Sequence, residues 1–159
     1  MNKDDYIYCV KQNSNRLYRL ALSFVKSHYD AEDIVQDVFF KLWKNDNDFE
    51  NEEHVEKWLT KVCINKCKDY FKSPFSKHSP LDEIQEFYTF DSTEKYDIFN
   101  AIMSLPKKER IVVHLFYYED MQIKEIAESL GIKESAVKTR LHRARKQIKE
   151  ALGDDWINE

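Results

Sequence analysis

Residues 122–152 read QIKEIAESLGIKESAVKTRLHRARKQIKEAL, and this stretch decides the fold of the last third of the chain. Apolar residues recur at helical spacing up to Gly131, and a glycine in the left-handed conformation is the usual C-terminal stop of a helix. Small Ala127 lets a second helix cross closely, and Ser135 is expected to cap that helix. The buried positions are Ile123, Ile126, Ala127 and Leu130, then Val137, Leu141, Ala144 and Ile148. This order predicts a helix-turn-helix.

The second helix of this motif concentrates positive charge. Residues 133–149 carry seven basic residues against Glu134 alone, a formal charge of +6 in a chain whose net charge is −4. In a helix-turn-helix the second helix enters the major groove of DNA, its early residues at base edges and its neighbours at phosphates. We expect base contacts from Thr139, His142 and Arg143, and phosphate contacts from Lys138, Arg140, Arg145, Lys146 and Lys149. The alternative is a basic surface helix without a role in nucleic-acid binding.

Composition predicts an all-α protein. Two glycines and three prolines in 159 residues, with apolar residues at helical spacing, leave little material for strands. The start of the chain lacks the apolar stretch of a signal peptide, and no run of about 18 apolar residues occurs, so we expect a cytoplasmic protein.

The chain has three cysteines, Cys9, Cys63 and Cys67, and this odd number argues against a disulfide framework. Cys63 either packs in the core as a small apolar residue or belongs to a metal site with Cys67 and His54. We expect the first, and therefore neither a metal nor a cofactor.

The first part of the chain predicts three amphipathic helices. One buries Leu17, Leu20, Ala21, Phe24 and Val25; the next, capped by Asp30 with Asp33 in the capping box and ending at Lys44, buries Ala31, Ile34, Val35, Val38, Phe39 and Leu42. The opposite face of that second helix shows Asp33, Gln36, Asp37, Phe40 and Lys41. An aromatic side chain among exposed carboxylates indicates a protein-binding face, although a single exposed apolar residue is also common on surfaces without partners.

A third helix follows the polar stretch 45–53. It buries Val55, Trp58, Leu59, Val62 and Cys63, and steps of three, four and seven residues place Lys57, Lys61, Lys68 and Lys72 on one face with Asn65. A solvated lysine face and a nucleic-acid contact both remain open from this spacing.

Periodicity fails between Ser73 and Glu94, where prolines and acidic residues dominate, and returns from Tyr96 through Ile98, Phe99 and Ile102. Pro106 suits the first position of a further helix that buries Ile111, Val112, Leu115 and Phe116. We therefore expect two small helical domains, 1–72 and 96–159, joined by a flexible acidic linker at 73–95.

Three segments together resemble the bacterial sigma-70 family, extracytoplasmic-function (ECF) group. They are DAEDIVQDVFFKLW at 30–43, HVEKWLTKVCINKCKDYFK at 54–72, and SLPKKERIVVHLFYYEDMQIKEIAESLGIKESAVKTRLHRARKQI at 104–148. The resemblance implies a dissociable, non-catalytic RNA polymerase subunit that directs promoter-specific initiation and takes no small-molecule substrate. It also implies an anti-sigma partner, often membrane-anchored, and a linker that threads toward the active cleft of the polymerase.

The resemblance also assigns residues. It places Asp33, Gln36, Asp37 and Phe40 where the family docks on the beta-prime clamp helices, and it adds the beta flap as a second contact on the polymerase core. It assigns the minus-10 element to Lys57, Lys61, Asn65, Lys66, Lys68, Asp69 and Lys72, with loop 45–53 capturing an extruded base. It assigns the minus-35 element to Lys138, Thr139, Arg140, His142, Arg143, Arg145 and Lys146; His142 departs from the aromatic residue of some members.

Two other classes of protein fit parts of the pattern. A conventional regulator with an N-terminal sensor domain would carry the same helix-turn-helix and bind a palindrome as a dimer. A helical enzyme would need paired carboxylates such as Glu32 and Asp33, but adjacent helix positions face apart and no His, Cys or Ser accompanies them at a catalytic spacing.

Overall fold

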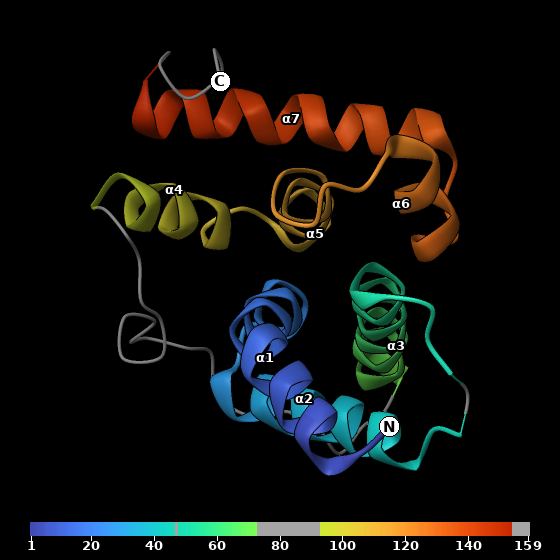
Figure 1. Ribbon diagram of the computed structural model, residues 1–159. Helices are drawn as coiled ribbons and strands as arrows, with labels where there is room; N and C mark the ends of the chain where they lie inside the picture. Colours follow the sequence, from blue (N-terminus) through green and yellow to red (C-terminus); the bar gives the residue numbers. More distant parts are fainter. Residues whose placement is uncertain (47, 73–92, 154–159) are drawn as a thin grey trace. The chain divides into compact units, whose positions relative to one another are not determined.

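The computed structural model describes residues 1–46, 48–72 and 93–153. These residues form seven α-helices and no strand, so the predicted all-α class is confirmed (Figure 1). The chain divides into two compact units, Met1–Glu86 and Phe87–Glu159. Residues 73–92 of the predicted linker lie outside the described residues. In the described part, no helix is both long enough and apolar enough to cross a bilayer.

Unit 1 is a bundle of three helices, α1 (Lys3–Val25), α2 (His28–Lys44) and α3 (Glu52–Lys72). Each helix packs on the other two. The predicted core positions are buried, except Val25 and Trp58, which are partly exposed. The core also takes in Leu22, Ile64 and Cys67, which the sequence pattern did not single out. The apolar stripes are therefore wider than the predicted ones, because each helix meets two neighbours rather than one.

The start of α2 differs from the prediction. Ser27 is the N-cap: its backbone is extended, at φ −145° and ψ 121°, and its hydroxyl accepts a hydrogen bond from the Asp30 amide at 3.4 Å. The prediction that Asp30 caps this helix, with Asp33 in the capping box, is wrong by three residues. Both Ser and Asp are good caps, and the backbone leaving α1 selects the earlier one. The Asp30 carboxylate is buried and accepts from Tyr70 instead.

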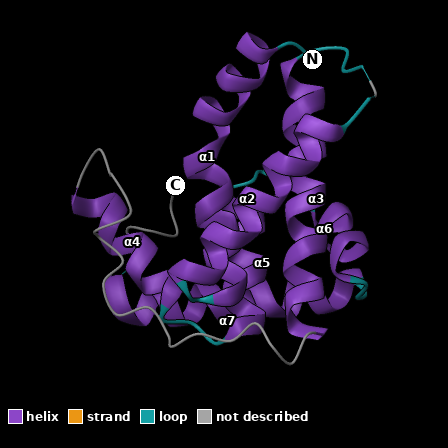
Figure 2. Cartoon of the chain, turned by 90° about the horizontal axis from the view of Figure 1, so that it is seen from below, coloured by secondary structure: helices purple, strands orange, loops and turns teal. Residues whose placement is uncertain are grey.

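Unit 2 contains α4 (Thr93–Met103), α5 (Lys107–Tyr117), α6 (Ile123–Leu130) and α7 (Glu134–Leu152), which Figure 2 shows from a second side. The long helix α7 packs on the other three. Helix α4 begins three residues before Tyr96, the predicted start of the second domain. Pro106 is the N-cap of α5 rather than its first helical residue, because it has an extended backbone with ψ 151°.

The helix-turn-helix is formed by α6, Gly131 and α7. Gly131 ends α6 at φ +67°, as predicted, and its amide and that of Ile132 both donate to the Ala127 carbonyl. A Cβ at Gly131 would meet open space, so the turn requires glycine for its backbone conformation and not for lack of room. The prediction that Ser135 caps α7 is wrong: the N-cap is Lys133, and Ser135 lies inside the first turn.

Candidate nucleic-acid and partner interfaces

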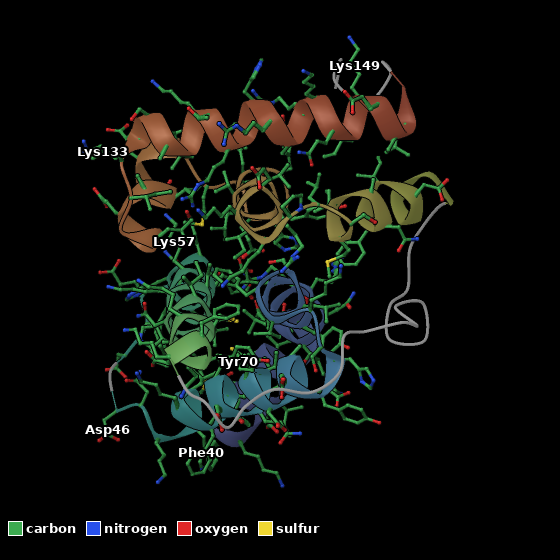
Figure 3. The ribbon with its side chains drawn as sticks, turned by 180° about the vertical axis from the view of Figure 1, so that it is seen from behind. Phe40, Asp46, Lys57, Tyr70, Lys133 and Lys149 are labelled. Atoms are coloured by element: carbon green, nitrogen blue, oxygen red, sulfur yellow. The ribbon has the colours of Figure 1, made fainter. Side chains whose placement is uncertain are left out.

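Helix α7 carries its apolar residues on one side and most of its cations on the other. Val137, Leu141, Ala144 and Ile148 are at most 2% exposed and face the rest of unit 2, so the predicted seam is confirmed. The exposed side carries Lys138, Thr139, His142, Arg143, Lys146 and Lys149, while Arg140 is partly exposed. Lys133 and Lys149 mark the two ends of this surface (Figure 3). A phosphate backbone can reach these cations without any rearrangement of the helix.

Arg145 differs from the other predicted DNA contacts on α7 in what it touches. Its side chain is partly exposed, as that of Arg140 is, but its Nε donates a hydrogen bond to the Tyr117 hydroxyl at 2.8 Å. Its guanidinium carbon lies 5.6 Å from the centre of the Phe116 ring and 5.7 Å from that of Tyr117. Both rings belong to α5. The structure therefore holds Arg145 against a neighbouring helix.

The outward face of α2 carries the predicted partner contacts. Asp33, Gln36 and Asp37 are exposed, and Phe40 is 57% exposed on the outer side of the helix (Figure 3). The Lys44 ammonium lies 4.6 Å from the centre of the Phe40 ring. These four predicted residues therefore share one accessible surface.

Trp43 extends this face, and the sequence prediction missed it. Its side chain is 53% exposed, and its ring packs edge-on against Tyr6 of α1 at 4.9 Å. The Tyr6 hydroxyl in turn donates to the Phe39 carbonyl at 3.0 Å, which fixes the end of α2 against α1. The position of Trp43, three residues after Phe40, was the signal that could have found it.

The predicted minus-10 residues divide between two sides of α3. Lys57, Lys61, Asn65, Lys68 and Lys72 lie along one side, at the steps of three, four and seven residues that the sequence shows. The Lys57 ammonium is 3.1 Å from the Glu53 carboxylate, and both side chains are more than 70% exposed. An exposed pair of this kind contributes about 0.2–1 kcal/mol, so a DNA phosphate can replace Glu53.

Lys66 and Asp69 lie on the other side of α3, toward α2. With Asp33 and Asp37 they line a hollow of about 260 Å³. Residues from the predicted polymerase face and from the predicted minus-10 set thus meet in one place, which their distance along the chain did not suggest.

Tyr70 and Asp30 close one side of this hollow. The Tyr70 hydroxyl donates to the buried Asp30 carboxylate at 2.8 Å (Figure 3). Burial, followed by the hydrogen bond to Asp30, raises the pKa of Tyr70 to about 12. The sequence reading missed this pair because it assigned Asp30 to capping α2.

Loop residues before α3 border a second hollow, of about 390 Å³, between this loop and the start of α1. Phe49 of the loop packs edge-on against His54 at 5.2 Å and Trp58 at 5.6 Å. The lining carries four carboxylates, from Asp5, Asp48, Glu52 and Glu56. Burial, and then the charges of Asp5, Glu52 and Glu56, raise the pKa of the Cys9 thiol. The hollow is therefore negative, and it suits an uncharged group better than a phosphate.

The cysteine–histidine alternative finds no support in the geometry. Cys63 and Cys67 are buried, and burial raises the pKa of the Cys67 thiol. His54 is exposed, and its Nδ1 accepts from the Glu50 amide at 3.1 Å. Among the described residues, no three His, Cys, Asp or Glu side chains are arranged to hold a metal ion.

Comparison with known proteins agrees with this architecture. The family model for sigma-70 region 2 matches residues 9–73, and the model for sigma-70 region 4 matches residues 96–148. The RNA polymerase sigma factor SigV of Bacillus subtilis is 31% identical over 149 residues, which are 92% of this chain and 90% of that protein. The ECF sigma factor SigE of Mycolicibacterium smegmatis is 28% identical over 90% of this chain and 60% of its own length.

A solved structure shows the same fold. It is the sigma factor RpoE in complex with the anti-sigma factor NepR from Bartonella quintana, which superposes with a TM-score of 0.61 at 23% identity and covers 95% of this chain and 98% of that one. The two matched regions lie in family order, region 2 on the three-helix bundle and region 4 on the helix-turn-helix unit. The chain therefore belongs to the sigma-70 family, in its ECF group, whose members are non-catalytic specificity subunits of transcription initiation.

Proposed function

We propose that this chain binds the core of RNA polymerase and directs it to promoters, with unit 1 at the minus-10 element and α7 at the minus-35 element. The observation that carries the proposal is the cationic side of α7, which lies opposite a fully buried seam in a helix-turn-helix. Such a helix places side chains in the major groove while its neighbours bind phosphates. Contacts at two separate promoter elements would need two separate units, and the chain forms two compact units.

The proposed polymerase contact is the outward face of α2, made by Asp33, Gln36, Asp37 and Phe40 and extended by Trp43. Exposed carboxylates speed and orient association with a basic partner surface, and aromatic side chains supply most of the binding energy at such interfaces. The beta-prime clamp helices are the expected partner of this face. The beta flap is the expected partner of unit 2.

The proposed minus-10 contact involves both sides of α3. The side with Lys57, Lys61, Asn65, Lys68 and Lys72 would follow the phosphate backbone. Lys66 and Asp69 would act at the hollow shared with α2. The negative hollow beside loop 45–53 would take an extruded base, because a base carries no charge of its own. Stacking and hydrogen bonds there would offset an unstacking cost of about a few kcal/mol.

The proposed minus-35 contact uses six exposed or partly exposed residues of α7. Arg143 makes the main base contact, because its guanidinium can donate two parallel hydrogen bonds to guanine. The six are Lys138, Thr139, Arg140, His142, Arg143 and Lys146. Thr139 donates its hydroxyl proton to the Ser135 carbonyl at 3.0 Å, which leaves its oxygen as an acceptor toward a base amino group.

We further propose that an anti-sigma protein covers the α2 face of this chain and so holds it inactive. The support is the Bartonella relative, which was solved with its anti-sigma factor bound. We place the working protein in the cytoplasm, since promoter DNA and the polymerase are found there.

In vitro transcription tests the proposal directly. Purified core polymerase should start RNA at defined sites on genomic fragments only when this chain is added, and the two should co-elute in size-exclusion chromatography. A chain that fails to co-elute with core polymerase, but binds a palindromic duplex as a dimer, would instead be a conventional regulator.

A further inference from the structure

Arg145 stands out among the cations of α7 because of what surrounds it. Lys138, Arg143 and Lys146 are exposed, whereas Arg145 is partly buried at the edge of the apolar seam. Its sequence position, in a run of basic residues, predicts a phosphate contact. Its environment indicates a different role.

The guanidinium of Arg145 makes two kinds of contact with α5. Its Nε donates to the Tyr117 hydroxyl at 2.8 Å, and its carbon Cζ lies within 6 Å of the Phe116 and Tyr117 ring centres. A cation is attracted to the face of an aromatic ring, and a hydrogen bond adds a preferred direction. Apolar contacts along the seam have no preferred direction, so they define the rotation of α7 about its own axis less well than the hydrogen bond does.

We propose that Arg145 is a positioning residue, which locks α7 onto α5 through Tyr117 and Phe116 and thereby sets the angle at which the exposed cations meet the minus-35 DNA. This inference rests on the proposed function of α7. Contacts to base edges require side chains placed within about 0.5 Å and 10–20°, so a small rotation of α7 weakens base readout. Phosphate contacts made by long, flexible lysines tolerate the same rotation.

Arg145→Lys separates the two roles. Lysine keeps the positive charge and binds phosphate as a point charge, but it lacks the Nε donor and the planar group that rests over the rings. A phosphate contact therefore survives this substitution, and a positioning contact does not. Tyr117→Phe removes the acceptor from the other side and leaves every cation in place.

The experiment uses holoenzyme assembled from core polymerase and the full chain. The probe is a duplex that wild-type holoenzyme selects from a random library, compared with the same duplex carrying a scrambled minus-35 element. Arg145→Lys and Tyr117→Phe should each lower the preference for the intact element by about tenfold or more, the effect of one lost hydrogen bond to a charged group. The double variant should lose no more than either single one.

Lys146→Gln is the matched control, because it removes a neighbouring exposed charge. It should reduce the magnitude of the slope of log K against log salt by about 0.9 and weaken binding to the intact and scrambled duplexes by the same factor, because a phosphate contact does not read sequence. Arg145→Gln should change that slope by less than half as much.

Three results would overturn the proposal. The first is a preference for the intact minus-35 element that is as strong in Arg145→Lys or Tyr117→Phe as in the wild type. The second is a change in the salt slope of Arg145→Gln that is at least half of the change in Lys146→Gln. The third is an equal loss on intact and scrambled duplexes, which would mean that the contact only stabilises the fold. If wild-type holoenzyme itself shows no minus-35 preference, the proposed function of α7 fails, and this outcome appears before any variant is made.

Discussion

Helices α3 and α7 both carry a line of cations, but the two are built differently. On α7 the apolar residues occupy one side and the cations another, so one helix holds the complete surface. On α3 the lysine side is only half of the predicted site, because Lys66 and Asp69 face α2 and share a hollow with Asp33 and Asp37. A pattern along one helix therefore describes the first surface well and the second surface only in part.

The two helices also differ in the acidic residues that surround their cations. The cations of α7 lie in residues 133–149, which contain one acidic residue, whereas Lys66 of α3 shares a hollow with carboxylates of α2 and Lys57 pairs with Glu53. We infer that unit 2 binds DNA mainly through local charge, and that unit 1 does so mainly through surfaces assembled from several segments. Four substitutions test this contrast, and they follow in order of decreasing effect.

Leu141→Ala should have the largest effect, because it opens a cavity in the seam that supports the whole cationic side of α7. Leu141 is 2% exposed, and truncation of such a residue lowers the free energy of unfolding by about 2–5 kcal/mol. Urea unfolding followed by circular dichroism measures this loss. The exposed neighbour His142→Ala should stay within about 0.5 kcal/mol of wild type. Equal effects of the two variants would contradict the proposed separation of the sides of α7.

Asp37→Lys should weaken binding to core polymerase by about tenfold or more, because it places a cation where the proposed basic partner surface docks. Size-exclusion co-elution and competition for core polymerase measure the change. Asp4→Lys makes the same charge reversal at an exposed position of α1, away from the outward face of α2, and should leave binding intact. Unchanged binding of Asp37→Lys would remove α2 from the polymerase interface.

Arg143→Ala should cost about 1–3 kcal/mol at the minus-35 element and relax its sequence preference, because the alanine side chain cannot bond to a base edge. Holoenzyme binding to duplexes that differ at single minus-35 positions measures both. An equal loss on random duplex DNA would show that Arg143 contacts only phosphate.

Tyr70→Phe should have the smallest effect, about 1 kcal/mol of unfolding free energy at neutral pH, because the buried Asp30 carboxylate loses one donor. The pKa of Tyr70 is about 12 in the folded protein against 10.0 ordinarily, so the neutral hydroxyl is favoured by folding. Its contribution is complete below pH 10 and is lost as the pH rises through 12. Urea unfolding should therefore show the gap between wild type and Tyr70→Phe closing over that range. A gap that is constant with pH would contradict the Tyr70–Asp30 contact.

Sequence reading succeeded where the physical cause is local. The seam of α7 and the buried face of α2 follow from helical spacing, and the Gly131 turn follows from the backbone freedom of glycine. It failed at the starts of α2, α5 and α7, where the incoming backbone decides which residue is the cap; Pro106 is the cap of α5 and not its first helical residue. Ser27 precedes Asp30 in α2, and Lys133, whose side chain makes no capping hydrogen bond, precedes Ser135 in α7.

Site residues on one helix could likewise be predicted, whereas pairs from two helices could not. The exposure of Asp33, Gln36, Asp37 and Phe40 was readable from the periodicity of one helix. The Tyr70–Asp30 bond joins residues 40 positions apart, and the Arg145–Tyr117 bond joins residues 28 apart. No local pattern encodes such pairs, because neither partner alone shows a need for the other.

The all-helical class, the two lines of cations and the apolar stripes could be predicted from the sequence alone, since these depend on spacing along single helices. Only the tertiary structure decided which polar residues face one another. It turned Lys66 and Asp69 toward α2, buried Asp30 beneath Tyr70 and held Arg145 against α5. The physical reason is that hydrogen bonds and cation–ring contacts act over a few ångströms, so they exist only once packing has brought distant segments together.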